Sequence, residues 1–146
     1  MANPGPATTL SNHPQVLGTN QALRLIASAQ SVNLAAAGDT AMVVVDVSKF
    51  VPVSVIITNG LNSSGNTTTI ATATVGVYTG QSQTGSTVLT TAALTSNTGG
   101  PYVTTTSATN AATAISNPTT MYVNVGTTIA ATCDVFVYGY DLTFLP

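Results

Sequence analysis

Few side chains in this 146-residue chain could perform acid–base or nucleophilic chemistry. There is one histidine, His13, one cysteine, Cys133, and no glutamate. The six charged residues are Arg24, Asp39, Asp46, Lys49, Asp134 and Asp141. Acid–base catalysis needs titratable groups held beside one another, and a Ser-His-Asp or Cys-His arrangement would have to use His13, which lies in a proline-rich segment. We therefore expect no catalytic residues and interpret the chain as not being an enzyme.

Patterns for metals, cofactors and nucleic acids are equally sparse. A zinc site needs three or four Cys, His or carboxylate ligands, and the four aspartates show no DxDxDG calcium-loop spacing. Lys and Arg total two and the pI is about 4.6, which is too little positive charge for phosphate binding. We expect no metal, no cofactor and no nucleic-acid partner. Asp39, which follows Gly38, is interpreted as a turn residue, and Asp134 as solvent-facing.

The composition is that of a folded domain with a neutral surface. Hydrophobic residues make up 44%, the mean hydropathy is +0.37 and the net charge is −2, whereas disordered chains combine low hydrophobicity with high net charge. Charged residues make up only 4%, against about 25% in ordinary domains. Because neutral surfaces associate, free monomers usually keep charged ones. We infer that partner molecules cover much of this surface.

Short apolar-alternating segments recur from Gln21 onward and are separated by Gly, Asn, Ser and Pro turn signals. The expected strands are 22–34, 40–47, 51–58, 67–80, 87–94, 102–108, 119–125 and 132–142. The first of these could also be a helix, because Ala and Leu favour one, but its evenly spaced apolar residues favour a strand. We predict an all-β fold, a single β-sandwich or jelly-roll-like domain of about eight strands over residues 21–146.

Three of the expected strands have one apolar face. The residues are Val51, Val53, Val55 and Ile57 in one strand, Met121, Val123 and Val125 in another, and Cys133, Val135 and Val137 in the last. For the last strand the reverse assignment, with Asp134, Phe136 and Tyr138 inward, stays open. We interpret Cys133 as a buried small hydrophobic residue.

Two regions are candidates for contacts with partners. Residues 1–20 are rich in Pro, Asn and Thr and indicate an extended arm, disordered in a free protein and docked in an assembled one. Docking would add backbone hydrogen bonds to a neighbour's sheet edge. Near the other terminus, aromatic residues could form a contact patch or cover the end of the core. The candidate interface residues are Pro4, Pro6, His13, Pro14, Tyr138, Tyr140 and Phe144.

Targeting and membrane signals are missing from the sequence. The first residues lack the basic and apolar regions of a secretory signal. The longest apolar run, Ala41 to Val45, is far shorter than the roughly 20 residues of a membrane span. We expect synthesis in a host cytoplasm and no membrane partner.

The segments AAAGDTAMVVV, VPVSVIITNG, VGVYTG, TMYVNVG and DVFVYGYDL, over roughly residues 30–142, resemble small virion proteins of tailed bacteriophages that sit on or stitch together the capsid shell. The resemblance implies a capsid decoration or cement protein on the capsid exterior, with the major capsid protein as partner and homo-oligomers, commonly trimers. It carries no catalytic residues, and the arm lies outside it. The alternative is a head- or tail-fibre module that binds a host-surface glycan near Tyr138 to Asp141.

Overall fold

The computed structural model describes residues 23–95, 103–109 and 113–143, of which 103–107 are described by their backbone alone. These residues contain ten β-strands and no helix, hence no helix able to span a membrane. The strands are β1 (Arg24–Asn33), β2 (Gly38–Ala41), β3 (Val43–Val44), β4 (Lys49–Leu61), β5 (Thr74–Tyr78), β6 (Thr87–Ala93), β7 (Val103–Ser107), β8 (Ile115–Ser116), β9 (Tyr122–Val125) and β10 (Thr132–Asp141). The all-β prediction is confirmed.

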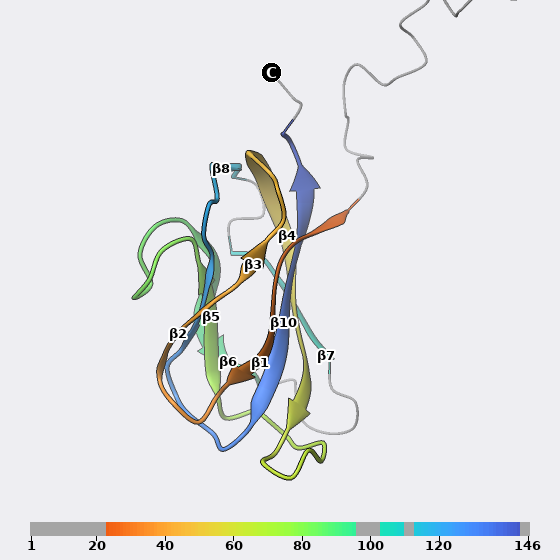
Figure 1. Ribbon diagram of the computed structural model, residues 1–146, viewed down its shortest axis with the longest axis vertical. Coiled ribbons are helices and arrows are strands. Elements are labelled where there is room, and N and C mark those ends of the chain that lie inside the picture. Colours follow the sequence, from red (N-terminus) through yellow and green to blue (C-terminus); the bar gives the residue numbers. More distant parts are fainter. Residues whose placement is uncertain (1–22, 96–102, 110–112, 144–146) are drawn as a thin grey trace, which may run out of the picture.

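The strands form two antiparallel sheets that pack face to face (Figure 1). Sheet A has the order β3-β1-β10-β4-β7, with β8 also paired to β4, and sheet B has the order β2-β9-β5-β6. When the two-residue strands β3 and β8 are set aside, eight strands remain. Numbered one to eight along the chain, strands 1, 8, 3 and 6 (β1, β10, β4 and β7) form sheet A in that order. Strands 2, 7, 4 and 5 (β2, β9, β5 and β6) form sheet B. This order is that of a jelly roll, so the predicted architecture is confirmed.

Backbone hydrogen bonds join the two sheets along both sides of the sandwich. On one side, a continuous segment pairs with β9 of sheet B over residues 38–41 and with β1 of sheet A over residues 43–44 (Figure 1). On the other side, Ala108 donates to a carbonyl of β4 at 3.0 Å, and Thr109 donates to one of β6 at 2.8 Å. The sandwich is thereby drawn toward a closed barrel, which limits how far the sheets can separate.

The core lies between the sheets; burial alternates along β10, whereas β5 and β9 in sheet B bury consecutive residues. Its largest fully buried side chains include Phe50, Ile26, Leu34, Ile57, Ile70 and Met121. In β9, Val123 and Val125 are buried beside Met121, as predicted. In β10, Cys133, Val135 and Val137 are fully buried, which settles the direction of that strand's alternation.

The prediction that four alternate residues of β4 share one buried face is wrong for the first half of the strand. The register with β10 passes from Ser54 opposite Tyr138 to Pro52 opposite Gly139, so β4 carries one extra residue there. Such a bulge reverses the alternation. Consequently Val55 and Ile57 are buried after the bulge, whereas before it the buried positions are Phe50 and Pro52, with Val51 and Val53 only partly covered.

Two further predictions are corrected. Within the predicted strand 67–80, only β5 is regular, because Ile70 turns inward as a fully buried residue and its carbonyl accepts a hydrogen bond from Ala73 N at 3.0 Å. The turn predicted at Gly38-Asp39 lies earlier, at residues 34–36, and those two residues begin β2.

Cys133 supplies a direct test of the β10 assignment. Burial, with a smaller contribution from the charge of Asp134, raises the pKa of its thiol from 9.0 to about 12. The reactive thiolate is therefore scarcer by about three orders of magnitude than for an ordinary thiol. We expect a maleimide or disulfide reagent to modify the folded protein at least about 1000-fold more slowly than the unfolded protein.

The control is a Cys133→Ala, Ser63→Cys variant, whose thiol lies in an exposed loop and should react rapidly in the folded state. Equal rates for Cys133 in the folded and unfolded protein would mean that β10 presents its other face to the core.

Candidate interaction surface

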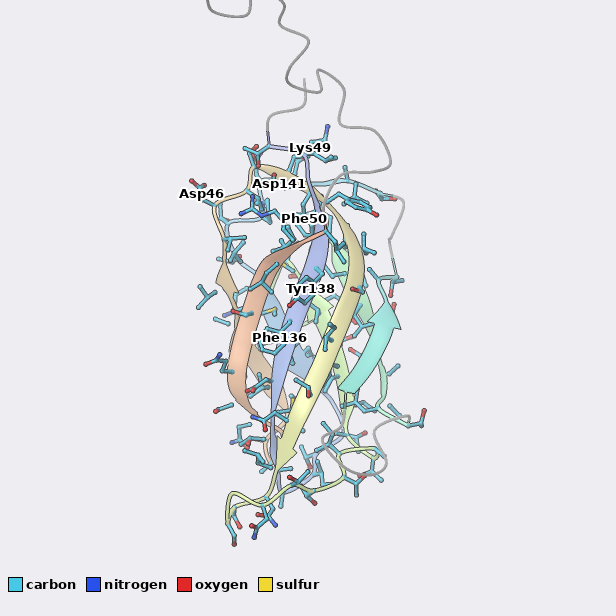
Figure 2. The ribbon with its side chains drawn as sticks, turned by 90° about the vertical axis from the view of Figure 1, so that its right-hand side faces the viewer. Asp46, Lys49, Phe50, Phe136, Tyr138 and Asp141 are labelled. Carbon is cyan, nitrogen blue, oxygen red and sulfur yellow. The ribbon has the colours of Figure 1, made fainter. Side chains whose placement is uncertain are left out.

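The outer face of sheet A carries a continuous group of aromatic and aliphatic side chains. They project from β10 and from its two neighbours, opposite the buried residues of each strand. We call the surface formed by Leu25, Val51, Ile56, Phe136, Tyr138 and Tyr140 the aromatic face. Figure 2 shows Phe136 and Tyr138 along the centre of this face, on β10 between β1 and β4.

Strand register brings these residues together from distant parts of the chain. Tyr138 lies opposite Leu25 of β1, Phe136 opposite Ile56 of β4, and Tyr140 opposite Val51. Directly opposed side chains on one face of an antiparallel pair are neighbours, with Cβ atoms about 5 Å apart. All six residues are half-buried, because each is flanked by the others.

The chemical character of this face is unusual for its position. An antiparallel sheet with one face on the core normally turns polar residues to solvent on the other. Here the outward positions of the central strand hold Phe136, Tyr138 and Tyr140. Tyrosines combine an apolar ring with a polar tip and are suited to a surface that is sometimes covered. Large exposed apolar patches on folded proteins are found at contact surfaces.

Asp134 closes one end of the aromatic face. Its Oδ1 accepts a hydrogen bond from Ser31 N at 2.8 Å, and its Oδ2 accepts one from Asn59 Nδ2 at 2.9 Å. Ser31 and Asn59 are non-glycine residues in the left-handed region, with φ of 53° and 58°, and each lies at a register shift, in β1 and β4 respectively. One carboxylate therefore holds irregular backbone on both neighbours of β10. Asp134 was expected to face solvent; it lies on the outer side, but both of its oxygens are engaged.

Most of the chain's charge lies at the other end of the aromatic face. Figure 2 shows Asp46, Lys49 and Asp141 gathered there, and Arg24 forms an ion pair with Asp141. Burial alone would raise the pKa of Asp141, but hydrogen bonds from Thr143 and the Arg24 guanidinium outweigh it and lower the pKa. Four of the six charged residues are thus confined to one end, and the middle of the aromatic face holds none.

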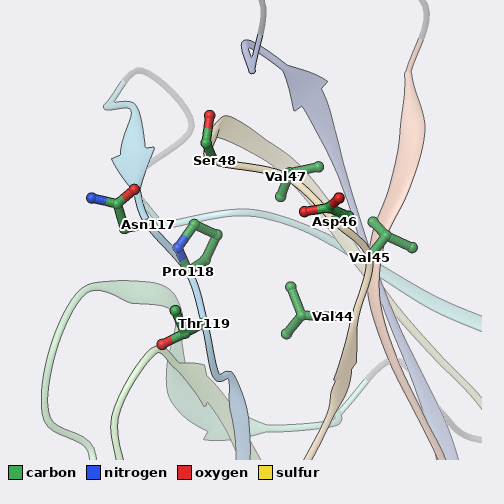
Figure 3. A pocket seen from close by; sticks show the side chains of 8 residues that line it. All are labelled: Val44, Val45, Asp46, Val47, Ser48, Asn117, Pro118 and Thr119. Atoms are coloured by element: carbon green, nitrogen blue, oxygen red, sulfur yellow. The ribbon is translucent and has the colours of Figure 1, made fainter.

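A cavity of about 400 Å³ opens at the charged end, between residues 44–48 and 117–119 (Figure 3). Its walls are valines, Pro118 and small polar side chains, and Asp46 is the one titratable group among the lining residues. A lone carboxylate can accept hydrogen bonds but cannot supply both an acid and a base. Within the described parts of the chain, no three His, Cys, Asp or Glu residues are grouped as metal ligands.

Two further cavities are present. One of about 180 Å³ is lined by residues 33, 35, 61–63 and 130–132, and one of about 390 Å³ lies between β1 and the β2–β3 segment. Neither is lined by the aromatic residues of β10. The aromatic face is therefore a broad surface and is distinct from these hollows.

Of the seven candidate interface residues, the structure brings two together. Tyr138 and Tyr140 both lie on the outer face of sheet A. The arm of residues 1–20, with Pro4, Pro6, His13 and Pro14, lies outside the described residues, as does Phe144. The sequence analysis did not include Phe136, Leu25 or Ile56 among the interface candidates. Alternation along β10 could have added Phe136, but the other two depend on strand pairing.

Comparison of the chain with protein-family models, curated proteins and solved structures finds no match. Its function is therefore inferred from its composition and geometry.

The first prediction from this surface concerns Asp134. Asp134→Ala removes the acceptor of two hydrogen bonds, and bonds to a charged group contribute about 1.5–3 kcal/mol each when well buried. Because Asp134 is partly exposed, water recovers part of this, and we expect a loss of about 2 kcal/mol in the free energy of unfolding, measured by urea titration. Asp46→Ala removes an exposed carboxylate and should change stability by less than about 0.5 kcal/mol. Equal effects of the two substitutions would contradict the clamping role.

The second concerns pH. The folded-state pKa of Asp141 lies below its ordinary value of 3.8, so its ionised form stabilises the fold above that value, and the stabilisation disappears as pH falls through the lower, folded-state pKa. Asp141→Asn should cost about 1 kcal/mol at pH 7 and close to nothing at the acid end. Paired unfolding curves from pH 7 to pH 2 measure this difference; a gap that is constant with pH would exclude ionisation as its source.

Proposed function

We propose that this protein is a structural component of a virion that coats the capsid of a tailed bacteriophage, binding major capsid subunits through the aromatic face and stabilising the head. The observation that carries this proposal is the aromatic and aliphatic outer face of sheet A, uncharged along its middle. Such a face is stabilised by being covered, since burial contributes about 25 cal/mol per Å² of apolar surface.

The size of the face suits a protein partner. Sheet A is five strands wide along its main path, and β1 and β10 are each ten residues long. At about 4.8 Å between strands and about 3.3 Å per residue, the part of the sheet formed by β1, β10 and β4 measures roughly 14 by 33 Å. The two-residue β3 and the five-residue β7 extend it at the sides, so sheet A can supply much of the roughly 800 Å² that one partner contributes to a protein–protein interface of ordinary size. Aromatic residues are enriched in such interfaces.

Because a capsid shell repeats the same binding surface many times, weak individual contacts would be sufficient for stable attachment. A shell presents many copies of the same binding surface, and linking copies of this protein into a homo-oligomer, such as a trimer, makes later contacts intramolecular. The closed jelly roll provides a rigid body for bridging adjacent subunits. The resemblance of the β-strand segments to small phage virion proteins supports the same function.

The alternative, a fibre module that binds a host glycan, is less well supported by the geometry. Jelly rolls occur in both capsid proteins and lectins, so the fold does not choose between them. A glycan site near Tyr138 to Asp141 would be expected to be concave. The three cavities described above are lined by other residues, and the Asp141 carboxylate is engaged by Arg24 and Thr143.

A paired substitution tests the proposed face. Tyr138→Ser removes an aromatic ring from the outer face of sheet A, and Tyr122→Ser removes one from the outer face of sheet B. In sedimentation with shells of the encoding virus assembled without this protein, Tyr138→Ser should weaken binding at least about tenfold, as expected for a central aromatic contact, while Tyr122→Ser binds as the parent does. Circular dichroism verifies that both variants are folded.

Salt provides a second measure in the same assay. Because the face is neutral, binding should change little between 50 and 500 mM NaCl, about the range over which exposed charge pairs are screened. A steep loss of binding with salt, or equal loss in both tyrosine variants, would overturn the proposed face. A few copies per particle, located at the tail, would favour the fibre alternative over a shell component.

A further inference from the structure

The crevice between β1 and the β2–β3 segment lies along a part of β1 whose outer edge is unpaired among the described residues, so an additional strand could pair there. It has a volume of about 390 Å³ and lies where the segment passes from its pairing with β9 of sheet B to its pairing with β1. Its lining residues are Ser28, Ala29 and Gln30 on one side and Thr40, Ala41 and Val43 on the other. All six are uncharged, and three of them are Ala or Val.

Backbone amide and carbonyl groups on both sides of this crevice are directed toward it and could pair with a further strand. β3 pairs with β1 only at Ala27 and Ser28, although β1 continues to Asn33. Because successive residues of a strand direct their amide and carbonyl groups to opposite edges, Gln30 presents these groups on the same side as Ser28. Just after β2, Met42 N donates to Met121 O at 2.8 Å, so the preceding residue, Ala41, directs its own amide and carbonyl away from β9 and toward the crevice. Among the described residues, β1 has no pairing partner on this side beyond Ser28.

The side chain beside this open edge is also exposed. Val43 is 75% exposed, and Leu23, at 48%, is the only other large hydrophobic residue of the described chain that is exposed to a comparable degree. Val43 therefore offers apolar surface next to unpaired backbone. Exposed strand edges of this kind accept further strands unless they are protected by charge, proline or covering segments. No charged residue lines the crevice.

We infer that residues 1–22 of a second copy of this chain occupy the crevice as an added strand. This segment contains no Asp, Glu, Lys or Arg, like the crevice, and its Leu10, Val16 and Leu17 could pack against the apolar half of the lining, Ala29, Ala41 and Val43. Twenty-two residues can extend about 70 Å, roughly twice the length of β1. The segment is therefore long enough to reach an adjacent molecule and form hydrogen bonds there.

The position of Leu23 favours a second copy over the same copy. The segment joins the described chain at the start of β1, and the crevice lies further along β1, beyond the two residues that pair with β3. To reach it, a chain's own N-terminal segment would have to reverse direction and pass β3. A neighbour's segment needs no such reversal. Each copy would donate one segment and accept one, which is satisfied by reciprocal exchange in a dimer or by a closed ring such as a trimer.

A photo-crosslink in the full-length protein tests this. Val43→p-benzoylphenylalanine places the probe at the crevice, and trypsin then releases residues 1–24 as one peptide, because Arg24 is the first cleavage site. The ¹⁴N- and ¹⁵N-labelled proteins are unfolded, mixed and refolded together so that oligomers contain both isotopes. Irradiation should then give a crosslink between residues 1–24 of one isotope and the probe-bearing peptide 25–49 of the other. The control, Ser63→p-benzoylphenylalanine in a distant exposed loop, should give no such product.

The other outcomes would overturn the inference. Crosslinks confined to one isotope would show that a chain's own segment fills the crevice, and a product with another peptide, or none, would exclude the segment altogether. In parallel, Val43→Asp should raise the dissociation constant of the oligomer at least about tenfold in light scattering, with the domain still folded. The test requires no shell, so failure to bind capsids leaves it unaffected.

Discussion

The pairing of β10 with β1 and β4 is the interaction on which both the core and the proposed docking surface depend. It places Cys133, Val135 and Val137 in the core and Phe136 and Tyr138 outside. Side chains alternate along a strand, so a slip of one residue would exchange the two sets and bury the ring edges and hydroxyl of the aromatic face. The hydrophobic pattern alone does not fix this register, because β1 and β4, the two neighbours of β10, both carry bulges at which the pairing shifts. The hydrogen bonds to the Asp134 carboxylate couple these irregularities to the same strand.

The distribution of charge follows from the same arrangement. Two of the six charged residues accept hydrogen bonds from backbone amides. Asp134 on sheet A accepts one from Ser31, and Asp39 on sheet B accepts one from Ser82 in the loop between β5 and β6. The other four lie at one end of the sandwich. A conventional surface would distribute charge over both sheets to keep monomers apart. Here the middle of the outer face of sheet A carries no charge, and that is the physical basis for proposing that it is covered.

The parts of the structure that were predictable are those governed by local alternation. The strands at 119–125 and 132–142, and the jelly-roll class, follow from apolar spacing and turn residues. The bulge in β4 was not predictable, because it depends on where Tyr138 and Gly139 of another strand lie. The shortening of β5 depends on Ile70 filling the core. The role of Asp134 depends on Ser31, 103 residues away, and that of Asp39 on Ser82, 43 residues away. Neither separation leaves a local signal.

The two sheets treat their outer faces differently, and the difference bears on which one receives a partner. On sheet B the loop between β5 and β6 is held against the strands by its own chain: Gln83 Nε2 donates to Asn124 Oδ1 at 3.0 Å, Asn124 Nδ2 donates to Asp39 Oδ1 at 2.8 Å, and Ser82 N donates to Asp39 Oδ2 at 2.7 Å. Asn124 is consequently buried although it lies on an outward position. On sheet A the described residues include no loop held over the aromatic face by comparable bonds. The outer face of sheet B is therefore covered in part by the chain's own loop, whereas the strand that carries Phe136 and Tyr138 lies at the centre of sheet A with no such loop among the described residues. This difference is the reason for placing the proposed docking surface on sheet A.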